Sequence, residues 1–114
     1  MYYIYMVRCA DDSIYTGIAA DLGRRMREHT DKSPTAAKYT RSRAVVSLEC
    51  VWTAEDRSAA SRLEYAIKRL PRQKKLQLIA GPTQLGTLLP QLNAQDYTPI
   101  PGITLESCVK GEPK

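Results

Sequence analysis

The sequence predicts an α+β domain: a small three-stranded antiparallel sheet flanked by helices, in the order β-β-α-β-α-α. Two short runs rich in aromatic and β-branched residues, 2–8 and 14–18, lie on either side of a polar turn and predict a β-hairpin. A third apolar run, 45–52, predicts the last strand, and the segments after the hairpin and after this strand carry apolar residues at helical spacing. The 114 residues amount to one domain.

The turn supports the hairpin as much as the strands do. Residues 10–13 read Ala-Asp-Asp-Ser, and short polar side chains of this kind hydrogen-bond to their own backbone in turns. Gly17 lies inside the second strand, where a glycine indicates a bulge or a close approach of another part of the chain.

A first helix is predicted over residues 21–31, with Asp21 as its N-cap. Arg25 and His29 are four residues apart, so they lie together on one face of this helix. Residues 31–43 are polar and basic and predict a loop.

Two further helices are predicted in the second half of the chain. The first starts at a cap, Asp56 or Ser58, and runs to about Leu70. Pro71 ends it and opens the second helix, 72–80, because proline is tolerated in the first turn of a helix.

Charge and composition divide the chain near residue 80. Residues 1–80 hold 15 Lys and Arg against 9 Asp and Glu, whereas residues 81–114 hold 2 against 3. The basic body indicates a polyanionic partner. We expect residues 81–114 to be a C-terminal extension, with one short helix around 85–92 and then a Pro/Gly-rich tail that is mobile or runs over the surface.

The cysteines and the apolar runs indicate the compartment. The three cysteines are odd in number and widely spaced, and there is a single histidine, so neither a disulfide framework nor a structural zinc site is expected. Free thiols fit a reducing cytoplasm. No apolar run approaches the roughly 20 residues that span a bilayer. We expect a soluble, cytoplasmic protein with no membrane contact, and its oligomeric state is left open.

Four motifs within residues 1–80 together resemble the GIY-YIG nuclease family. Two are Tyr3-Ile4-Tyr5 and Tyr15-Thr16-Gly17, at the places of the tripeptides that name the family, and the others are RRMREH at 24–29 and LEYAIK at 63–68. The likeness extends to small single-domain bacterial members and to the catalytic modules of structure-specific endonucleases. It implies the fold predicted above and a catalytic domain over residues 1–80.

The resemblance implies roles for four residues near the N-terminus. Tyr5 and Tyr15 would align or deprotonate the attacking water, with His29 assisting. Arg25 follows Gly17 by the family's eight-residue spacing, and its forked guanidinium suits the charge that gathers on a phosphodiester under attack. Each residue also has a purely structural interpretation: cross-strand packing for the tyrosines, solvent exposure for the arginine and a helix-dipole contact for the histidine.

The resemblance also implies a metal site. Glu64 matches the glutamate that is the sole protein ligand of the divalent ion in the family, and one hard oxygen ligand with waters and phosphate is typical of Mg²⁺ or Mn²⁺ sites. The structural alternative is a surface ion pair with Lys68. Many members carry asparagine about twelve residues later, where this chain has Leu76. Gln73 and Gln77 are nearby in the sequence, and the resemblance does not extend to this polar contact.

The remaining basic residues are predicted to contact the backbone of a nucleic acid, with one tyrosine stacking on an unpaired base. The predicted contact residues are Arg24, Lys38, Tyr39, Arg41, Arg43, Lys68, Arg72, Lys74 and Lys75. The alternative is a solvated basic surface without a ligand.

These inferences predict a metal-dependent endonuclease that hydrolyses DNA phosphodiester bonds in DNA repair or recombination. Branched and single-stranded DNA are both left open as substrates, as is RNA. Two alternatives stand beside it: a nucleic-acid-binding module without catalysis, and a nuclease subunit that depends on a protein partner docked on the leucine-bearing segment 83–92.

Overall fold

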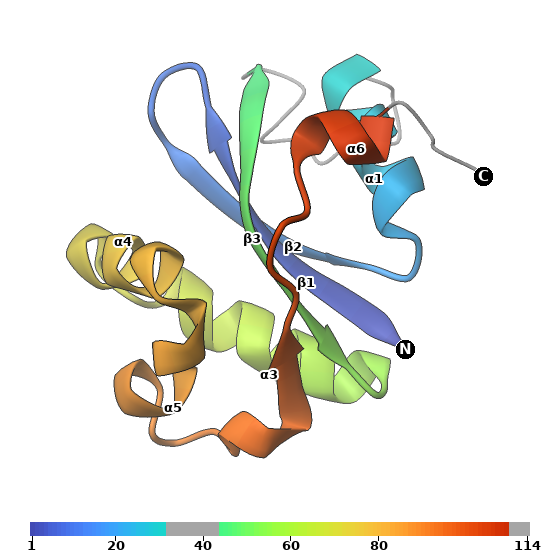
Figure 1. Ribbon diagram of the computed structural model, residues 1–114. Helices are drawn as coiled ribbons and strands as arrows, with labels where there is room; N and C mark the ends of the chain where they lie inside the picture. The colour runs from blue at the N-terminus through green and yellow to red at the C-terminus, as the bar shows by residue number, and fades with distance from the viewer. Residues whose placement is uncertain (32–43, 110–114) are drawn as a thin grey trace.

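The computed structural model describes residues 1–31 and 44–109, in which helices cover both faces of a four-stranded antiparallel sheet (Figure 1). The spatial order of the strands is β2-β1-β3-β4. The strands are β1 (Tyr2–Cys9), β2 (Ile14–Ala19), β3 (Val45–Ala54) and β4 (Tyr97–Pro99). The predicted α+β class is confirmed, but the prediction of three strands was wrong.

The fourth strand comes from the segment predicted to be an irregular tail. Residues Tyr97–Pro99 pair antiparallel with residues 52–54 at the end of β3. A run of three residues that includes a proline is too short to carry an alternating pattern, and proline in a sheet is confined to edges. Only the exposed edge of β3 makes this segment a strand.

The β1–β2 hairpin is formed as predicted. Its register places Tyr5 opposite Gly17 and Val7 opposite Tyr15. Side chains alternate between the faces of a strand, so Tyr5 and Tyr15 lie diagonally across the same face. In the turn, Asp12 has a positive φ of 70°, a conformation that aspartate tolerates better than most residues.

The helices are divided between the two faces of the sheet (Figure 1). On the face that carries Tyr5, two helices lie side by side: α1 (Leu22–Asp31) and α6 (Leu105–Val109). The opposite face is covered by α3 (Arg57–Lys68), α4 (Arg72–Ala80) and α5 (Leu85–Leu88). Two 3₁₀ turns, η1 (Pro82–Gln84) and η2 (Ala94–Asp96), connect the last elements.

Side-chain caps fix where the two main helices begin. The Asp21 carboxylate accepts a hydrogen bond from the Arg24 amide at 3.1 Å. Asp56, not Ser58, caps α3, and its carboxylate accepts from the Ala59 amide at 2.9 Å. Each cap satisfies an amide at the helix start that has no partner within the helix.

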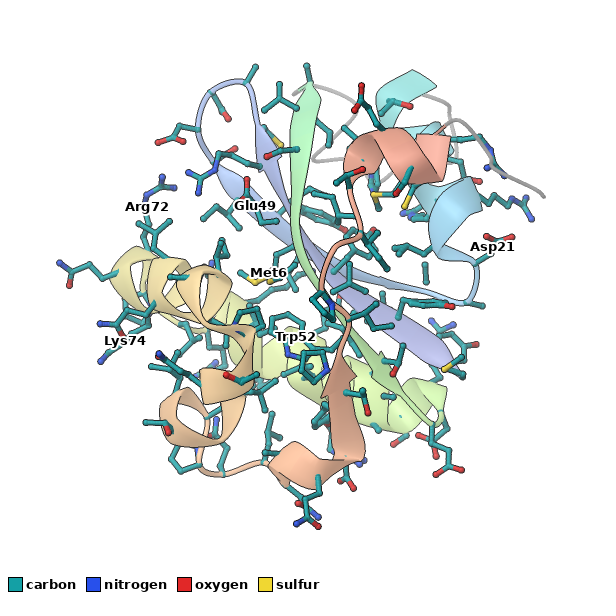
Figure 2. The ribbon with its side chains drawn as sticks, viewed as in Figure 1. Met6, Asp21, Glu49, Trp52, Arg72 and Lys74 are labelled. Atoms are coloured by element: carbon teal, nitrogen blue, oxygen red, sulfur yellow. The ribbon has the colours of Figure 1, made fainter. Side chains whose placement is uncertain are left out.

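Residues beyond 81 contribute to the main core. Leu85, Leu89 and Tyr97 are at most 5% exposed and belong to the cluster that contains Trp52. The Trp52 indole donates to the Pro82 carbonyl at 3.2 Å, and the Tyr97 hydroxyl donates to a carbonyl of α3 at 2.7 Å. Figure 2 shows Met6 and Trp52 in the space between the sheet and these helices. The functional boundary near residue 80 stays a prediction.

Within the described part of the chain, no helix has the length and apolar character needed to cross a membrane.

We expect Leu89→Ala to lower the free energy of unfolding by about 2–4 kcal/mol, because it leaves a cavity in the main core. Leu89 is 1% exposed, whereas its neighbour Leu88 is only partly buried. Leu88→Ala is the matched control and should cost clearly less. Urea unfolding followed by circular dichroism measures both, and equal small losses would contradict the inclusion of Leu89 in the core.

Candidate active site

Three rings meet on the α1 face of the hairpin and form the centre of the site. The ring centroids of Tyr5 and Tyr15 are 6.4 Å apart, and the His29 ring lies edge-on to both, at 5.6 Å and 5.9 Å. Tyr5 and His29 are fully buried, whereas Tyr15 is only partly buried. We call these three residues the ring cluster. The hairpin register supplies the two tyrosines, and the helical spacing of α1 brings the histidine over them.

A hydrogen-bond chain connects the cluster to Arg25. The Tyr5 hydroxyl oxygen lies 2.8 Å from His29 Nε2, and it also hydrogen-bonds to the Arg25 guanidinium. Arginine can only donate, so the Tyr5 oxygen accepts from Arg25 and its own proton is directed to His29. This assignment makes Nε2 the acceptor nitrogen of a neutral imidazole.

The pKa values of both groups agree with this arrangement. Burial is the main cause that raises the pKa of Tyr5 well above its ordinary value, and it outweighs the opposing hydrogen bond from Arg25. Burial, aided by the positive charge of Arg25, lowers the pKa of His29 to about 4. At neutral pH the tyrosine therefore keeps its proton and the histidine stays uncharged.

Gly17 is required by the position of the Tyr5 ring. A Cβ atom at residue 17 would lie 2.5 Å from the Tyr5 hydroxyl oxygen and 2.7 Å from Cζ. The ring thus lies directly over the backbone of its cross-strand partner, which only glycine permits. The close approach indicated by Gly17 in the sequence is made by the first candidate tyrosine.

Glu28 sets the position of the neighbouring arginines. Its two carboxylate oxygens accept from Arg25 Nη1 at 2.8 Å and from Arg24 Nε at 3.3 Å. The Arg25 side chain is 24% exposed and that of Arg24 is 71% exposed, so the arginine selected by the motif is the one that faces the cluster. Burial lowers the pKa of Arg25, but the hydrogen bonds with Glu28 and Tyr5 outweigh it and raise the pKa overall. Nothing in the sequence motif singled out Glu28.

Glu64 and Lys68 approach the cluster from α3. The Lys68 ammonium lies 5.2 Å from the Tyr15 ring centroid and 3.1 Å from the Glu64 carboxylate. The Glu64 side chain is 24% exposed, and its charge contributes to the raised pKa of Tyr5. Because α3 covers the opposite face of the sheet, these two side chains reach the rings around the edge strand β2.

This carboxylate fits a hard divalent ion that is otherwise held by waters and substrate. Over residues 1–31 and 44–109, no group of three or more His, Cys, Asp or Glu gathers in a way that could hold a metal ion by itself. A single partly exposed carboxylate beside the ring cluster is the donor set that Mg²⁺ or Mn²⁺ accepts when phosphate oxygens complete the shell. In the ion's absence the ammonium of Lys68 neutralises the same carboxylate.

The other predicted contact residues lie farther out. Arg72 Nη2 pairs with Asp12 in the hairpin turn at 2.9 Å, so the start of α4 is tied to the hairpin. Figure 2 shows Arg72 extending from α4 toward the hairpin and Lys74 extending away from it into solvent, while Lys75 is partly buried. Four predicted contacts lie outside the described residues: Lys38, Tyr39, Arg41 and Arg43.

We expect Gly17→Ala to displace the Tyr5 ring and break its bond to His29, at a cost of about 1–3 kcal/mol in stability. Gly23→Ala is the matched control, since a Cβ there meets its nearest neighbour at 3.5 Å and alanine favours a helix. Chemical denaturation and the NMR signals of the single histidine measure both effects. Native stability and an unshifted histidine in Gly17→Ala would contradict the close approach.

We expect stability to fall as the pH drops below 6.5, because the unfolded chain then binds a proton that folded His29 takes up only near pH 4. By pH 4 the loss assigned to this residue should be roughly 3 kcal/mol. It is measured as the difference between wild type and His29→Gln in unfolding experiments across pH. A histidine that titrates near 6.5 by NMR in the folded protein would refute the buried neutral state.

Known proteins resemble this chain across the region that builds the site. The GIY-YIG catalytic domain matches residues 1–77. The UPF0213 protein FN1575 of Fusobacterium nucleatum is 47% identical over 81 residues, covering 71% of this chain and 79% of that protein. The UPF0213 protein DP2720 of Desulfotalea psychrophila is 46% identical over 78 residues, covering 68% and 70%.

A solved structure is also similar. The solution NMR structure of the UPF0213 protein BH0048 from Bacillus halodurans is 38% identical, covers 78% of this chain and 97% of its own, and has a TM-score of 0.46. All residues of the site, from Tyr5 to Lys68, lie within the range that the catalytic domain matches. The chain belongs to the GIY-YIG family.

Proposed function

We propose that the protein is a metal-dependent endonuclease that hydrolyses phosphodiester bonds in DNA. The family match suggests a nuclease. The single observation that carries the proposal is the convergence of Tyr15, Arg25 and Glu64, from β2, α1 and α3, around the Tyr5–His29 pair. If each of these residues had only a structural role, there would be no reason for all of them to lie together.

We assign the contact with the attacking water to Tyr15. Its side chain is partly exposed and lies under the Lys68 ammonium, whereas Tyr5 is buried and its hydroxyl proton is directed to His29. The raised pKa of Tyr5 argues against that residue as the base. Tyr5 and His29 then act as positioning residues that fix the ring of Tyr15 against the sheet.

Arg25 is proposed to bind the non-bridging oxygens of the scissile phosphate. Glu28 holds one edge of its guanidinium, so the group is orientated before substrate arrives. A preorganised donor aimed at developing charge stabilises a transition state more than a mobile one does. Because the guanidinium remains charged over the working pH range, its contribution does not depend on pH.

Glu64 is the residue that would hold the divalent ion, Mg²⁺ or Mn²⁺. When bound, such an ion offsets the charge on the phosphate and on the leaving oxygen. Lys68 pairs with the same carboxylate, and its ammonium would be close enough to contact a substrate phosphate held there.

The biological setting that fits best is DNA repair or recombination in the cytoplasm. The basic body favours a polyanionic substrate. All three cysteines are free, and Cys9 and Cys50 are buried, in keeping with a reducing compartment. Lys38, Tyr39, Arg41, Arg43, Arg72, Lys74 and Lys75 remain proposed contacts to the nucleic acid.

The test is cleavage of labelled branched, nicked and single-stranded DNA with Mg²⁺ or Mn²⁺. Arg25→Ala and Tyr15→Phe should each lower the rate by about 10²- to 10³-fold, the loss typical of removing one group that stabilises or aligns a reacting centre. Glu64→Gln should abolish metal-dependent cleavage. Binding measured by fluorescence anisotropy should persist in all three variants.

Arg24→Ala is the matched control for the cleavage step, because this arginine pairs with the same glutamate but is mostly exposed. As a predicted contact to the DNA backbone it should weaken binding without slowing the cleavage of bound DNA. Its cleavage rate should change less than threefold on the scale of a surface ion pair. No cleavage by the wild type, with binding equal in every variant, would overturn the nuclease and favour a binding module or a nuclease subunit that requires a protein partner.

A further inference from the structure

A groove on the far side of α3 is unused by the site described above. It has a volume of about 430 Å³ and runs between α3 and the segment that contains α5. Its floor is apolar and its rim is basic. The floor is formed by Ala66, Leu70, Leu88, Leu89 and Leu92, and the rim carries Arg62, Tyr65, Arg69 and Gln91. We call it the α3 groove.

Tyr65 is the most unusual residue at this rim. It is 65% exposed, one of three large apolar side chains in the described residues that are mostly exposed. Arg69 holds it, since the guanidinium donates to the Tyr65 hydroxyl at 3.2 Å and its carbon lies 5.3 Å from the ring centroid. An exposed aromatic ring orientated by an arginine is a platform on which a nucleobase can stack.

The charge around the groove favours a polyanion. None of the described residues that line it is acidic. Residues 57–80, which form α3 and α4, hold seven Lys and Arg against the single carboxylate of Glu64. Figure 1 shows α3, α4 and α5 together on one side of the sheet. Of these cations, Arg62 and Arg69 line the groove itself.

The groove is adjacent to the candidate metal ligand along the helix. Tyr65 directly follows Glu64, and consecutive side chains on an α-helix diverge by about 100°. A nucleic-acid strand whose phosphate lies at Glu64 would pass over the solvent-exposed side of α3 and bring its next base to Tyr65. Paired bases are stacked inside a duplex and cannot make this contact.

We propose that the α3 groove binds an unpaired nucleotide next to the scissile phosphodiester, with its base stacked on Tyr65 and its phosphates contacting Arg62 and Arg69. The proposal rests on the proposed function, because it takes the strand held at Glu64 as the one that crosses α3. It makes single-stranded or flap-containing DNA the substrate class.

An acidic amphipathic protein segment is the competing occupant of a groove with this floor and rim. A nucleotide is favoured over a protein segment by the position of Tyr65, which directly follows Glu64 on α3 and is mostly exposed to solvent. An amphipathic protein segment would be bound by the apolar floor of the groove and would not require an exposed aromatic ring at its rim.

The test measures binding in EDTA, which prevents metal-dependent cleavage. Fluorescence anisotropy compares an oligo(dT) strand with a strand of equal length made of abasic sites, which has the same phosphates but no bases. The wild type should bind oligo(dT) about 5- to 100-fold more tightly, the range expected for one stacked base. The variants are made in a Tyr39→Ala background, because Tyr39 is itself proposed to stack on a base. There Tyr65→Ala should lose this preference, and Tyr65→Phe and Tyr65→Trp should keep it.

Charge and folding are controlled separately. Arg62→Gln should lower the slope of log K against log salt by about 0.7, the value for one contact to a single strand, while Tyr65→Ala leaves the slope unchanged. Val46→Ala removes an exposed apolar side chain on β3 and should alter neither quantity. Thermal melts confirm that each variant is folded.

A base preference that survives Tyr65→Ala would overturn the proposal. So would a wild type that binds both strands equally, which would leave the groove to an acidic protein segment. Because no cleavage is measured, a failed nuclease assay with the stacking preference intact would overturn the proposed function and the place next to a scissile bond, and would leave the groove as a site for an unpaired nucleotide.

Discussion

The site depends on the close approach of the Tyr5 ring to the backbone of Gly17. This contact lets the tyrosine lie flat against its cross-strand partner, so that its hydroxyl reaches His29 Nε2 at 2.8 Å. The histidine then lies edge-on to both tyrosines and fixes the distance between them. Any side chain at residue 17 would move the ring, and with it the geometry that α1 and β2 share.

A second constraint is that each candidate charge at the site already has an opposite charge beside it. Arg25 is held by Glu28, and Glu64 is paired with Lys68. Partly buried charges are costly unless they are paired, and these partners hold the two candidate groups in position. Under the proposed function, a phosphate and a divalent ion would replace Glu28 and Lys68 in part as the partners of Arg25 and Glu64. The hairpin turn is secured in the same way, since Asp12 pairs with Arg8 and with Arg72.

The segment after residue 81 packs against α3 and fixes its position on the sheet. Leu85, Leu89 and Tyr97 fill the core behind this helix, and β4 closes the open edge of β3. α6 lies beside α1 on the other face of the sheet. The two helices that carry Arg25 and Glu64 are therefore each supported by a segment that follows the family's matched residues. The α3 groove exists only because α5 lies alongside α3.

The sequence by itself determined the hairpin, α1, β3, α3 and α4, because each carries a run of strand-forming residues, apolar residues at helical spacing, or a cap or a breaker. It also determined the five principal site residues as candidates, since Tyr5, Tyr15, Arg25, His29 and Glu64 stand at motif spacing. Tertiary structure decided the rest. It made a three-residue segment into β4 by presenting an unpaired strand edge, and it gave Glu28 and Lys68 their partners by bringing side chains together. Tyr5 and Tyr15 differ in burial, although both are hairpin tyrosines in the sequence, because Tyr5 lies on the interior strand β1 and Tyr15 lies on the edge strand β2. The burial of a side chain and the partner of a charged group depend on contacts between segments that are distant in the sequence, so the local sequence does not predict them.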